Sequence, residues 1–188
     1  MDTKLANALQ QVTRFLEDNG LRYAVVGGIA LSYWNVSRFT HDIDIKLLVP
    51  NTEYAATRQL LRTEFPSKTR ENVPENMLIV AVSVNDVIVD FLLTLPGYEE
   101  LIIERAVQQD LGEFSIWVCT AEDLIIQKVV ASRDKDWPDV EALLIEQWHE
   151  LDQHYVEEWL SQFAEALEIP ELLSRYLAVR GRVHGMVE

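Results

Sequence analysis

Apolar residues recur at helical spacing near the start of the chain and predict a first helix over residues 4–18: Leu5, Leu9, Val12 and Leu16. Gly20 follows this run as a stop signal. Residues 22–26 form a short β-prone run that ends at the pair Gly27-Gly28, and the sequence after the pair predicts a short helix. The order strand, glycine turn, helix is therefore expected.

Polar and apolar residues alternate over residues 41–49, which predicts a strand with two different faces. The residues of one face are polar: Asp42, Asp44 and Lys46. The residues of the other face are apolar: Ile43, Ile45 and Leu47. Two carboxylates are therefore predicted to lie side by side on one strand face.

A hairpin is predicted further along, where residues 77–84 and 87–93 form two β-prone runs. They are joined through Asn85 and Asp86, which tolerate the left-handed conformations of a tight turn. Alternation in the second run places Asp90 on a face whose other members are apolar, namely Ile88 and Leu92. A lone carboxylate in an apolar strand needs a partner.

The middle of the chain predicts two more helices and one more strand. A helix begins at Asn51 or Thr52, either of which can act as a cap, and a polar loop over residues 66–76 lies behind it. Another helix is expected over residues 97–108, followed by a strand over residues 113–119.

The last third of the chain is helical in pattern. Thr120 and Asp123 predict a capping box at the start of a helix. Three successive helices follow, and each has a residue suited to a first helical turn: Pro138, Asp152 and Pro170. They are expected to end near Val179, with a loose tail over residues 180–188.

Length and composition fit a globular core over residues 1–145 with a helical extension over residues 146–188 packed on it. The chain has 188 residues, of which 48% are hydrophobic. No apolar run reaches the roughly 18 residues that span a bilayer, and the chain does not begin with a signal-peptide core. We expect a cytoplasmic protein, with no membrane partner. The one cysteine, Cys119, lies in a β-prone run and is expected to be a buried thiol without chemistry.

The charge of the chain is strongly negative, with 16 Lys and Arg against 31 Asp and Glu and a net charge of -15. Binding a long nucleic acid requires many cations to neutralise phosphates, and this chain has no surplus of Lys and Arg. The charge therefore argues against a broadly basic nucleic-acid surface, although a local basic patch is still compatible with it. The acidity favours solubility and also suits a cationic partner.

The most informative stretch is residues 27–45, in which the glycine pair precedes an Asp-x-Asp sequence on the next strand. Glycine lets backbone amides approach a phosphate closely, and the helix that starts there adds its positive end. A triphosphate would therefore bind at Gly27 and Gly28. Asp42 and Asp44 would be about 7 Å apart at Cα, close enough to serve two metal ions spaced roughly 3.5 to 4 Å apart.

Asp90 would close this site from a neighbouring strand. Three carboxylates in one small volume repel one another unless cations neutralise them. Hard oxygen ligands favour Mg²⁺ or Mn²⁺ over zinc. The sequence thus predicts that Asp42, Asp44 and Asp90 are both catalytic residues and metal ligands, with two ions between them.

These residues resemble the polymerase-β-like nucleotidyltransferase superfamily over about residues 22–145. The resemblance implies an α/β protein of the α+β type, with a mixed β-sheet flanked by helices and a C-terminal helical annex. It also implies that a nucleoside monophosphate is transferred from an NTP to an acceptor, with release of pyrophosphate.

A finer match looks like the branch that contains AbiEii-type abortive-infection toxins and minimal nucleotidyltransferases. It rests on three patterns: Arg38-x-Thr40-x-Asp42-Ile43-Asp44, Asp123-Leu124-Ile125-x-x-Lys128 and Arg133-x-Lys135-Asp136-x-x-Asp139-Val140. The resemblance implies that Lys128 faces the nucleotide, and it adds an antitoxin as a partner. The branch often has a small hydroxylated residue directly after the glycine pair; Ile29 stands there, so Ser32 is a weaker phosphate-contact candidate.

Each cation near the predicted site has a structural alternative. Arg38 either binds triphosphate or stabilises the Asp42 loop, or it is a surface loop cation, and Thr40 likewise has a functional and a surface-loop interpretation. Lys128 either faces the nucleotide or extends from the edge of the core. Lys46 is either a counter-charge for Asp44 or a triphosphate ligand.

Other conspicuous residues favour structural roles. Three aspartates suit helix caps and solvated turns better than metal ligands: Asp134, Asp136 and Asp139. His41 points to the strand face opposite Asp42. Three tryptophans recur at helical spacing and are expected in the core of the terminal helices: Trp137, Trp148 and Trp159.

The leading hypothesis is a metal-dependent nucleotidyltransferase whose acceptor is tRNA, a protein or a cationic small molecule. Motif detail favours tRNA and a toxin of a toxin-antitoxin or abortive-infection system, whereas acidity favours the other two acceptors. The alternative is a non-catalytic regulatory or binding module that keeps the fold.

Overall fold

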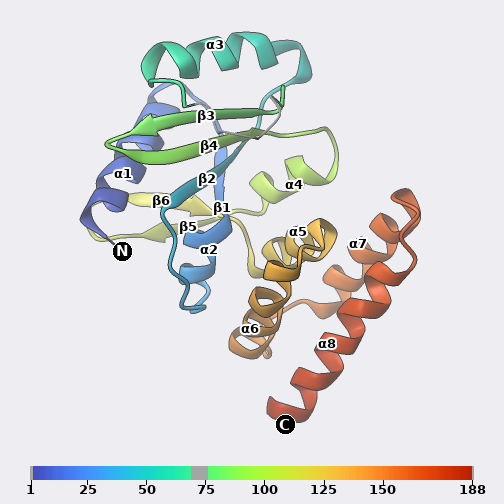
Figure 1. The fold of residues 1–188 in the computed structure, drawn as a ribbon. Helices are drawn as coiled ribbons and strands as arrows, with labels where there is room; N and C mark the ends of the chain where they lie inside the picture. Colours follow the sequence, from blue (N-terminus) through green and yellow to red (C-terminus); the bar gives the residue numbers. More distant parts are fainter. Residues whose placement is uncertain (1, 69–75, 188) are drawn as a thin grey trace. The chain divides into compact units, whose positions relative to one another are not determined.

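The computed structural model describes residues 2–68 and 76–187, and these form two compact units (Figure 1). The first unit comprises Met1–Ala30 and Phe39–Cys119, and the second comprises Leu31–Arg38 and Thr120–Glu188. The division therefore follows Cys119, whereas the sequence suggested a boundary after residue 145. Most of the predicted polar loop over residues 66–76 lies outside the described residues.

The first unit contains one six-stranded sheet with the order β3-β4-β2-β1-β6-β5. Its strands are β1 (Tyr23–Val26), β2 (Asp42–Leu47), β3 (Ile79–Val84), β4 (Val87–Leu93), β5 (Val107–Asp110) and β6 (Ser115–Val118). β2 pairs with β4 in parallel, as does β1 with β6, and the other neighbours are antiparallel. This confirms the predicted mixed sheet.

The predicted hairpin joins β3 to β4. Asn85 and Asp86 have φ angles of 52° and 63°, so both central residues of the turn are left-handed. Two such residues define the turn whose twist matches that of the flanking strands. Local turn chemistry therefore sets this register.

The helices of the first unit are α1 (Thr3–Asp18), α2 (Gly27–Tyr33), α3 (Tyr54–Glu64) and α4 (Tyr98–Glu104), of which α1, α3 and α4 pack on strands of the sheet. The last residues of α2 belong to the second unit. Phe91 of β4 stacks on Phe65 with ring centroids 6.2 Å apart, and Phe65 contacts Phe15 of α1 edge-on at 5.1 Å. Because Phe91 follows Asp90 in the strand, α1 covers the face opposite the carboxylate.

Two details of the first unit differ from the predictions. A 3₁₀ turn over Asn51–Glu53 precedes α3, and no side chain caps either of them. The helix expected to reach residue 108 ends at Glu104, and Val107–Asp110 forms the edge strand β5. Half-buried and exposed residues alternate along β5. Four residues are too short a pattern to predict a strand, and the strand is defined by its pairing with β6.

The second unit consists of residues 31–38 and a set of helices: α5 (Ala121–Ala131), α6 (Trp137–Gln147), α7 (Gln153–Ala166) and α8 (Glu171–Val187). Thr120 caps α5, since its hydroxyl oxygen accepts from the backbone N–H of Asp123. The same hydroxyl donates to Asp123 Oδ2 at 2.9 Å, and the Tyr155 hydroxyl donates to Oδ1 at 2.9 Å. This buried network joins α5 to α7.

The predicted loose tail is wrong, because α8 continues to Val187 and buries Val183 completely. Gly181 and Gly185 weaken the helical pattern of this segment, but a Cβ at either would meet nothing within 4 Å. The glycines thus lie on an open side of the helix, while Tyr176, Val179 and Val183 form its buried stripe.

The tryptophans of the second unit are half-buried rather than core residues. The guanidinium of Arg175 lies 4.1 Å from the ring centroid of Trp137, and Trp148 stacks on His184 with centroids 5.7 Å apart. Cys119 is buried, as predicted. Within residues 2–68 and 76–187, no helix is long and apolar enough to cross a membrane.

Candidate functional site

The carboxylates of β2 and β4 share one face of the sheet. In the parallel register Asp44 lies opposite Asp90, and Asp42 lies opposite Ile88. Residues directly opposite in neighbouring strands are about 4.8 Å apart and point to the same side. Two carboxylates that are 46 positions apart in the sequence are thus neighbours, with Asp42 one position further along the same face.

Burial differs among these three residues. Asp42 and Asp44 are half-buried, whereas Asp90 is 7% exposed. The alternate residues of β2 face the core, and Ile43 and Ile45 have no exposed surface. The alternation read from the sequence therefore assigns the two faces correctly.

The glycine pair lies directly against this face. Gly27 has a φ of 65°, and a Cβ there would be 3.0 Å from Asp44 Cγ and closer still to one carboxylate oxygen. A Cβ at Gly28 would be 2.6 Å from Cβ of Thr40, whose hydroxyl donates to the carbonyl of Asp42 at 3.1 Å. Both positions require glycine because their backbone lies against the side chains of Asp44 and Thr40. The start of α2 is therefore beside the carboxylates.

Lys46 lies on the carboxylate face and is buried, with its ammonium 2.5 Å from Glu99 Oε1 of α4. Glu99 also accepts from the backbone N–H of Leu95 at 2.7 Å. The sequence left Lys46 as a counter-charge for Asp44 or a triphosphate ligand. The structure gives it an acidic partner that sequence reasoning missed, on a helix more than fifty residues away.

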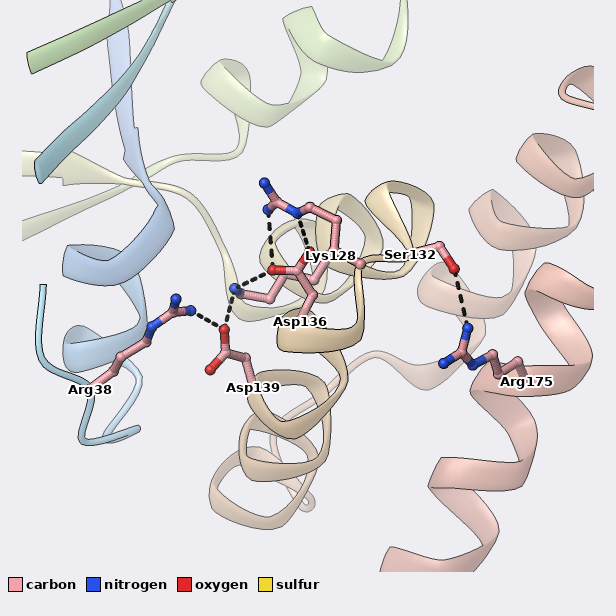
Figure 2. Close-up of polar contacts among 7 residues, drawn as sticks. Arg38, Lys128, Ser132, Asp136, Asp139 and Arg175 are labelled. Atoms are coloured by element: carbon pink, nitrogen blue, oxygen red, sulfur yellow. Dashed lines mark hydrogen bonds and ion pairs between the residues drawn. The ribbon is translucent and has the colours of Figure 1, made fainter. Parts of the chain in front are cut away.

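A second group of charged residues lies in the second unit (Figure 2). We call Arg38, Lys128, Arg133, Asp136 and Asp139 the Asp139 cluster. Arg38 and Lys128 both donate to Oδ2 of Asp139, with Lys128 at 2.6 Å. Lys128 also lies 3.6 Å from Asp136 Oδ1, and its side chain is only 7% exposed. The two predicted nucleotide-binding cations thus share one carboxylate.

Asp136 is held by a second cation. Arg133 donates to both carboxylate oxygens of Asp136, from Nε at 2.5 Å and from Nη2 at 3.1 Å. Burial raises the pKa of Asp136, but the hydrogen bonds from Arg133 and the charge of Lys128 outweigh it and lower the pKa below its ordinary value.

The prediction that Asp136 and Asp139 are solvated caps is wrong. They are 1% and 8% exposed, whereas Asp134 is exposed as expected. Asp136 has no side-chain capping bond at the start of α6. One sequence signal was available, because a spacing of three residues places Asp136 and Asp139 on the same side of a helix. The buried Lys128 pairs with both carboxylates, so this side of the helix start faces inward.

The predicted site residues therefore fall into two groups. Gly27, Gly28 and the three aspartates come together in the first unit, while Arg38 and Lys128 come together in the second. Ser32 is exposed on α2. His41 is exposed, and its ring contacts Phe39 edge-on at 4.6 Å. In the part of the chain that the structure describes, no three His, Cys, Asp or Glu residues are grouped so as to hold one metal ion.

This mixed sheet flanked by helices is the nucleotidyltransferase fold. The antibiotic-resistance factor ANT(2'')-Ia matches with a TM-score of 0.56 and 18% identity, over 98% of this chain and 100% of that chain. An antigenic nucleotidyltransferase-like protein from Paracoccidioides brasiliensis matches with a TM-score of 0.54 and 14% identity, over 91% of both chains. The lincosamide antibiotic adenylyltransferase LnuA matches with a TM-score of 0.50 and 12% identity, over 73% and 94%.

The chain belongs to the family described as nucleotidyltransferase of unknown function (DUF6036), whose model matches residues 3–179. No curated protein matches the sequence. The family match confirms that the chain is a member of a nucleotidyltransferase family, as the glycine pair and the aspartates indicated. The AbiEii-type branch inferred from the finer patterns is not among these findings.

Proposed function

We propose that this protein transfers a nucleoside monophosphate from an NTP to an acceptor, using Asp42, Asp44 and Asp90. The register of β2 and β4 is the observation that carries the proposal, since it pairs Asp44 with Asp90 on the face that adjoins the glycine turn. A structural sheet gains nothing from three carboxylates on one face, because like charges repel.

The donor chemistry of this face fits a divalent cation. All three side chains offer carboxylate oxygens, which are the ligands that Mg²⁺ and Mn²⁺ prefer. Two ions held there would polarise the α-phosphate and offset the charge of the leaving pyrophosphate. The metal requirement is a proposal that rests on this donor set.

Other groups of the first unit would bind the triphosphate and accept the proton of the acceptor. The backbone at Gly27 and Gly28, at the start of α2, would hold the triphosphate. An acceptor oxygen then forms a bond to the α-phosphorus while the bond to the bridging oxygen breaks. Pyrophosphate leaves, and the acceptor proton passes to a carboxylate, for which we propose the buried Asp90.

Arg38 and Lys128 remain our candidates for further phosphate contacts. Both are bonded to Asp139, and Lys128 is buried. Either cation would have to share or exchange this carboxylate in order to bind a phosphate. The proposed role therefore predicts that the nucleotide alters the Asp139 cluster.

For the acceptor we favour a cationic small molecule over RNA. The net charge of -15 opposes a long polyanion. Two proteins of similar fold are an adenylyltransferase for lincosamide antibiotics and ANT(2'')-Ia, solved with adenylyl-2''-tobramycin. The toxin role and an antitoxin partner were suggested by the finer sequence patterns alone, and they make tRNA the competing acceptor.

A label-transfer assay tests this proposal. The protein is incubated with each α-labelled NTP, Mg²⁺ or Mn²⁺ and total cell extract, and the label is followed into RNA, protein and small-molecule fractions. Asp44→Asn and Asp90→Asn should abolish transfer, whereas Asp18→Asn, an exposed carboxylate of the same unit, should retain it. Full activity in either site variant would refute the proposed site. No transfer by the wild type, without any nucleotide binding, would favour the non-catalytic module.

A further inference from the structure

A pocket of about 400 Å³ lies in the first unit at the beginning of β1, and we call it the Trp117 pocket. This volume is within the range of about 300 to 1,000 Å³ that is typical of small-molecule sites. It is lined by the end of α1 and the loop that follows, by the end of α4, and by β1 and β6, with Glu17, Leu21, Arg22, Ile103, Glu104 and Trp117 among the lining residues. Nothing in the proposed reaction uses these residues.

One wall of the pocket is apolar. Trp117 is 40% exposed, although its neighbours Ile116 and Val118 in β6 are fully buried. Strand alternation therefore turns the indole away from the core that holds those neighbours. Leu21 and Ile103 also contribute to the lining. An aromatic face that is open to a hollow suits a flat or apolar ligand.

The rim of the pocket favours a cation. Glu17 and Glu104 are exposed carboxylates, and Arg22 offsets only one of them. α1 ends at Asp18 and α4 ends at Glu104, so both helices direct their C-terminal ends to this pocket. The last carbonyls of a helix carry partial negative charge, which attracts cations. An indole face likewise attracts a cation rather than an anion.

Tyr23 also lines the pocket, and its hydroxyl donates to Glu17 Oε1 at 3.1 Å. Burial and the nearby charge of Glu17 raise the pKa of Tyr23 well above its ordinary value. The hydroxyl is therefore neutral at physiological pH and holds the Glu17 carboxylate at the pocket. This bond orients one of the two acidic groups before any ligand arrives.

We propose that the Trp117 pocket binds a small organic cation with a flat ring, its ammonium group at Glu17 and Glu104 and its ring against Trp117. The site is distinct from the nucleotide site, because β1 separates Tyr23 from Gly27 by about 13 Å at the strand rise. Reacting atoms must approach to roughly 3 to 3.5 Å. A compact ligand in this pocket is therefore not the acceptor of the proposed transfer.

Calorimetric titration of the full chain, without nucleotide or metal, tests the ligand class. Three probes share the indole ring: tryptamine is a cation, 3-methylindole is neutral and 3-indolepropionate is an anion. We expect saturable binding of tryptamine, weaker binding of the neutral probe and none of the anion. Equal binding of all three, or no binding of tryptamine at millimolar concentration, would overturn the proposal.

Single substitutions locate the bound probe. Trp117→Leu keeps apolar bulk but removes the aromatic face, and Glu104→Gln keeps the shape but removes a charge. Each should weaken tryptamine binding by about two- to fivefold, as expected for exposed cation–π and ion-pair contacts. Trp148→Leu and Glu113→Gln serve as matched controls outside the pocket and should leave binding unchanged. If Trp117→Leu fails to fold, Glu104→Gln still decides, and unchanged binding in that variant places the ligand elsewhere.

Discussion

Gly27 has two separate reasons to be glycine. Its φ of 65° is left-handed, and a Cβ would also collide with the carboxylate of Asp44. Gly20 shares the first reason only, because its φ is 68° but a Cβ there meets nothing within 4 Å. Comparing substitutions at the two positions therefore separates the cost of backbone strain from the cost of a collision with the Asp44 carboxylate.

We expect Gly27→Ala to be more destabilising than Gly20→Ala. Gly20→Ala should lower the free energy of unfolding by about 1 kcal/mol or slightly more, the strain of a left-handed non-glycine residue. Gly27→Ala adds the displacement of Asp44 and should also abolish stabilisation by NTP and metal. Urea unfolding of both variants, with and without ligand, measures this. Equal losses in the two variants would mean that the contact with Asp44 has no consequence.

Lys128 is the residue whose context the structure changes most. The sequence left its role open between a nucleotide cation and an edge-of-core side chain, and the structure buries it between Asp136 and Asp139. A variant that removes its charge therefore affects folding as well as any phosphate contact.

Lys128→Met should lower the free energy of unfolding by about 1.5 to 3 kcal/mol, through the loss of a charge-assisted hydrogen bond. Arg38 and Arg133 still neutralise the two carboxylates, so the loss stays below the roughly 3 to 5 kcal/mol of an uncompensated buried charge. Lys135→Met, an exposed neighbour, is the control. Adding Asp139→Asn to Lys128→Met should be less than additive, and strict additivity would show that the pair is not coupled.

The segment between α5 and α6 forms an acid-sensitive element. Asp136 has a lowered pKa in the folded state, so it binds a proton less readily there than in the unfolded chain. Its stabilisation is complete above its ordinary pKa of 3.8 and is lost as the pH falls through the lower folded value.

Asp136→Asn should therefore be less stable than wild type near neutral pH, and the difference should shrink below about pH 4. Urea unfolding across this range measures the two curves. Asp134→Asn, on the exposed side of the same turn, should show no such convergence. A constant difference between Asp136→Asn and wild type would mean that the carboxylate has the same pKa in both states.

At the scale of the whole molecule, ligand binding should appear as thermal stabilisation. NTP with Mg²⁺ or Mn²⁺ binds the folded state, and at about 100 times the dissociation constant it adds roughly 2.7 kcal/mol. For a chain of this length that corresponds to a rise in Tm of about 5 to 11 °C.

Scanning calorimetry tests this expectation and also shows whether the two units unfold together. The chelated sample and Asp44→Asn are the controls, and neither should respond to NTP as the wild type does with metal. A melt that saturating metal and all four NTPs leave unchanged would contradict the proposed activity. It would support a binding module that keeps the fold.

Some features were fixed by the sequence because they depend on local periodicity or turn chemistry. Alternation assigned the faces of β2, the left-handed pair Asn85-Asp86 set the hairpin, and Thr120 capped α5. Each of these follows from residues within a few positions of one another. The glycine pair and the aspartates likewise sufficed to indicate a nucleotidyltransferase.

Other features depended on pairing between distant segments. β5 was missed because a four-residue strand has too short a pattern until β6 pairs with it, and the end of α8 was missed because its glycines conceal the buried stripe. The neighbourhood of Asp44 and Asp90, and the sharing of Asp139 by Arg38 and Lys128, likewise come from strand order and helix packing. Sequence periodicity tells which side a residue faces, but only tertiary contacts decide what lies opposite, because those contacts gain their energy from groups far apart along the chain.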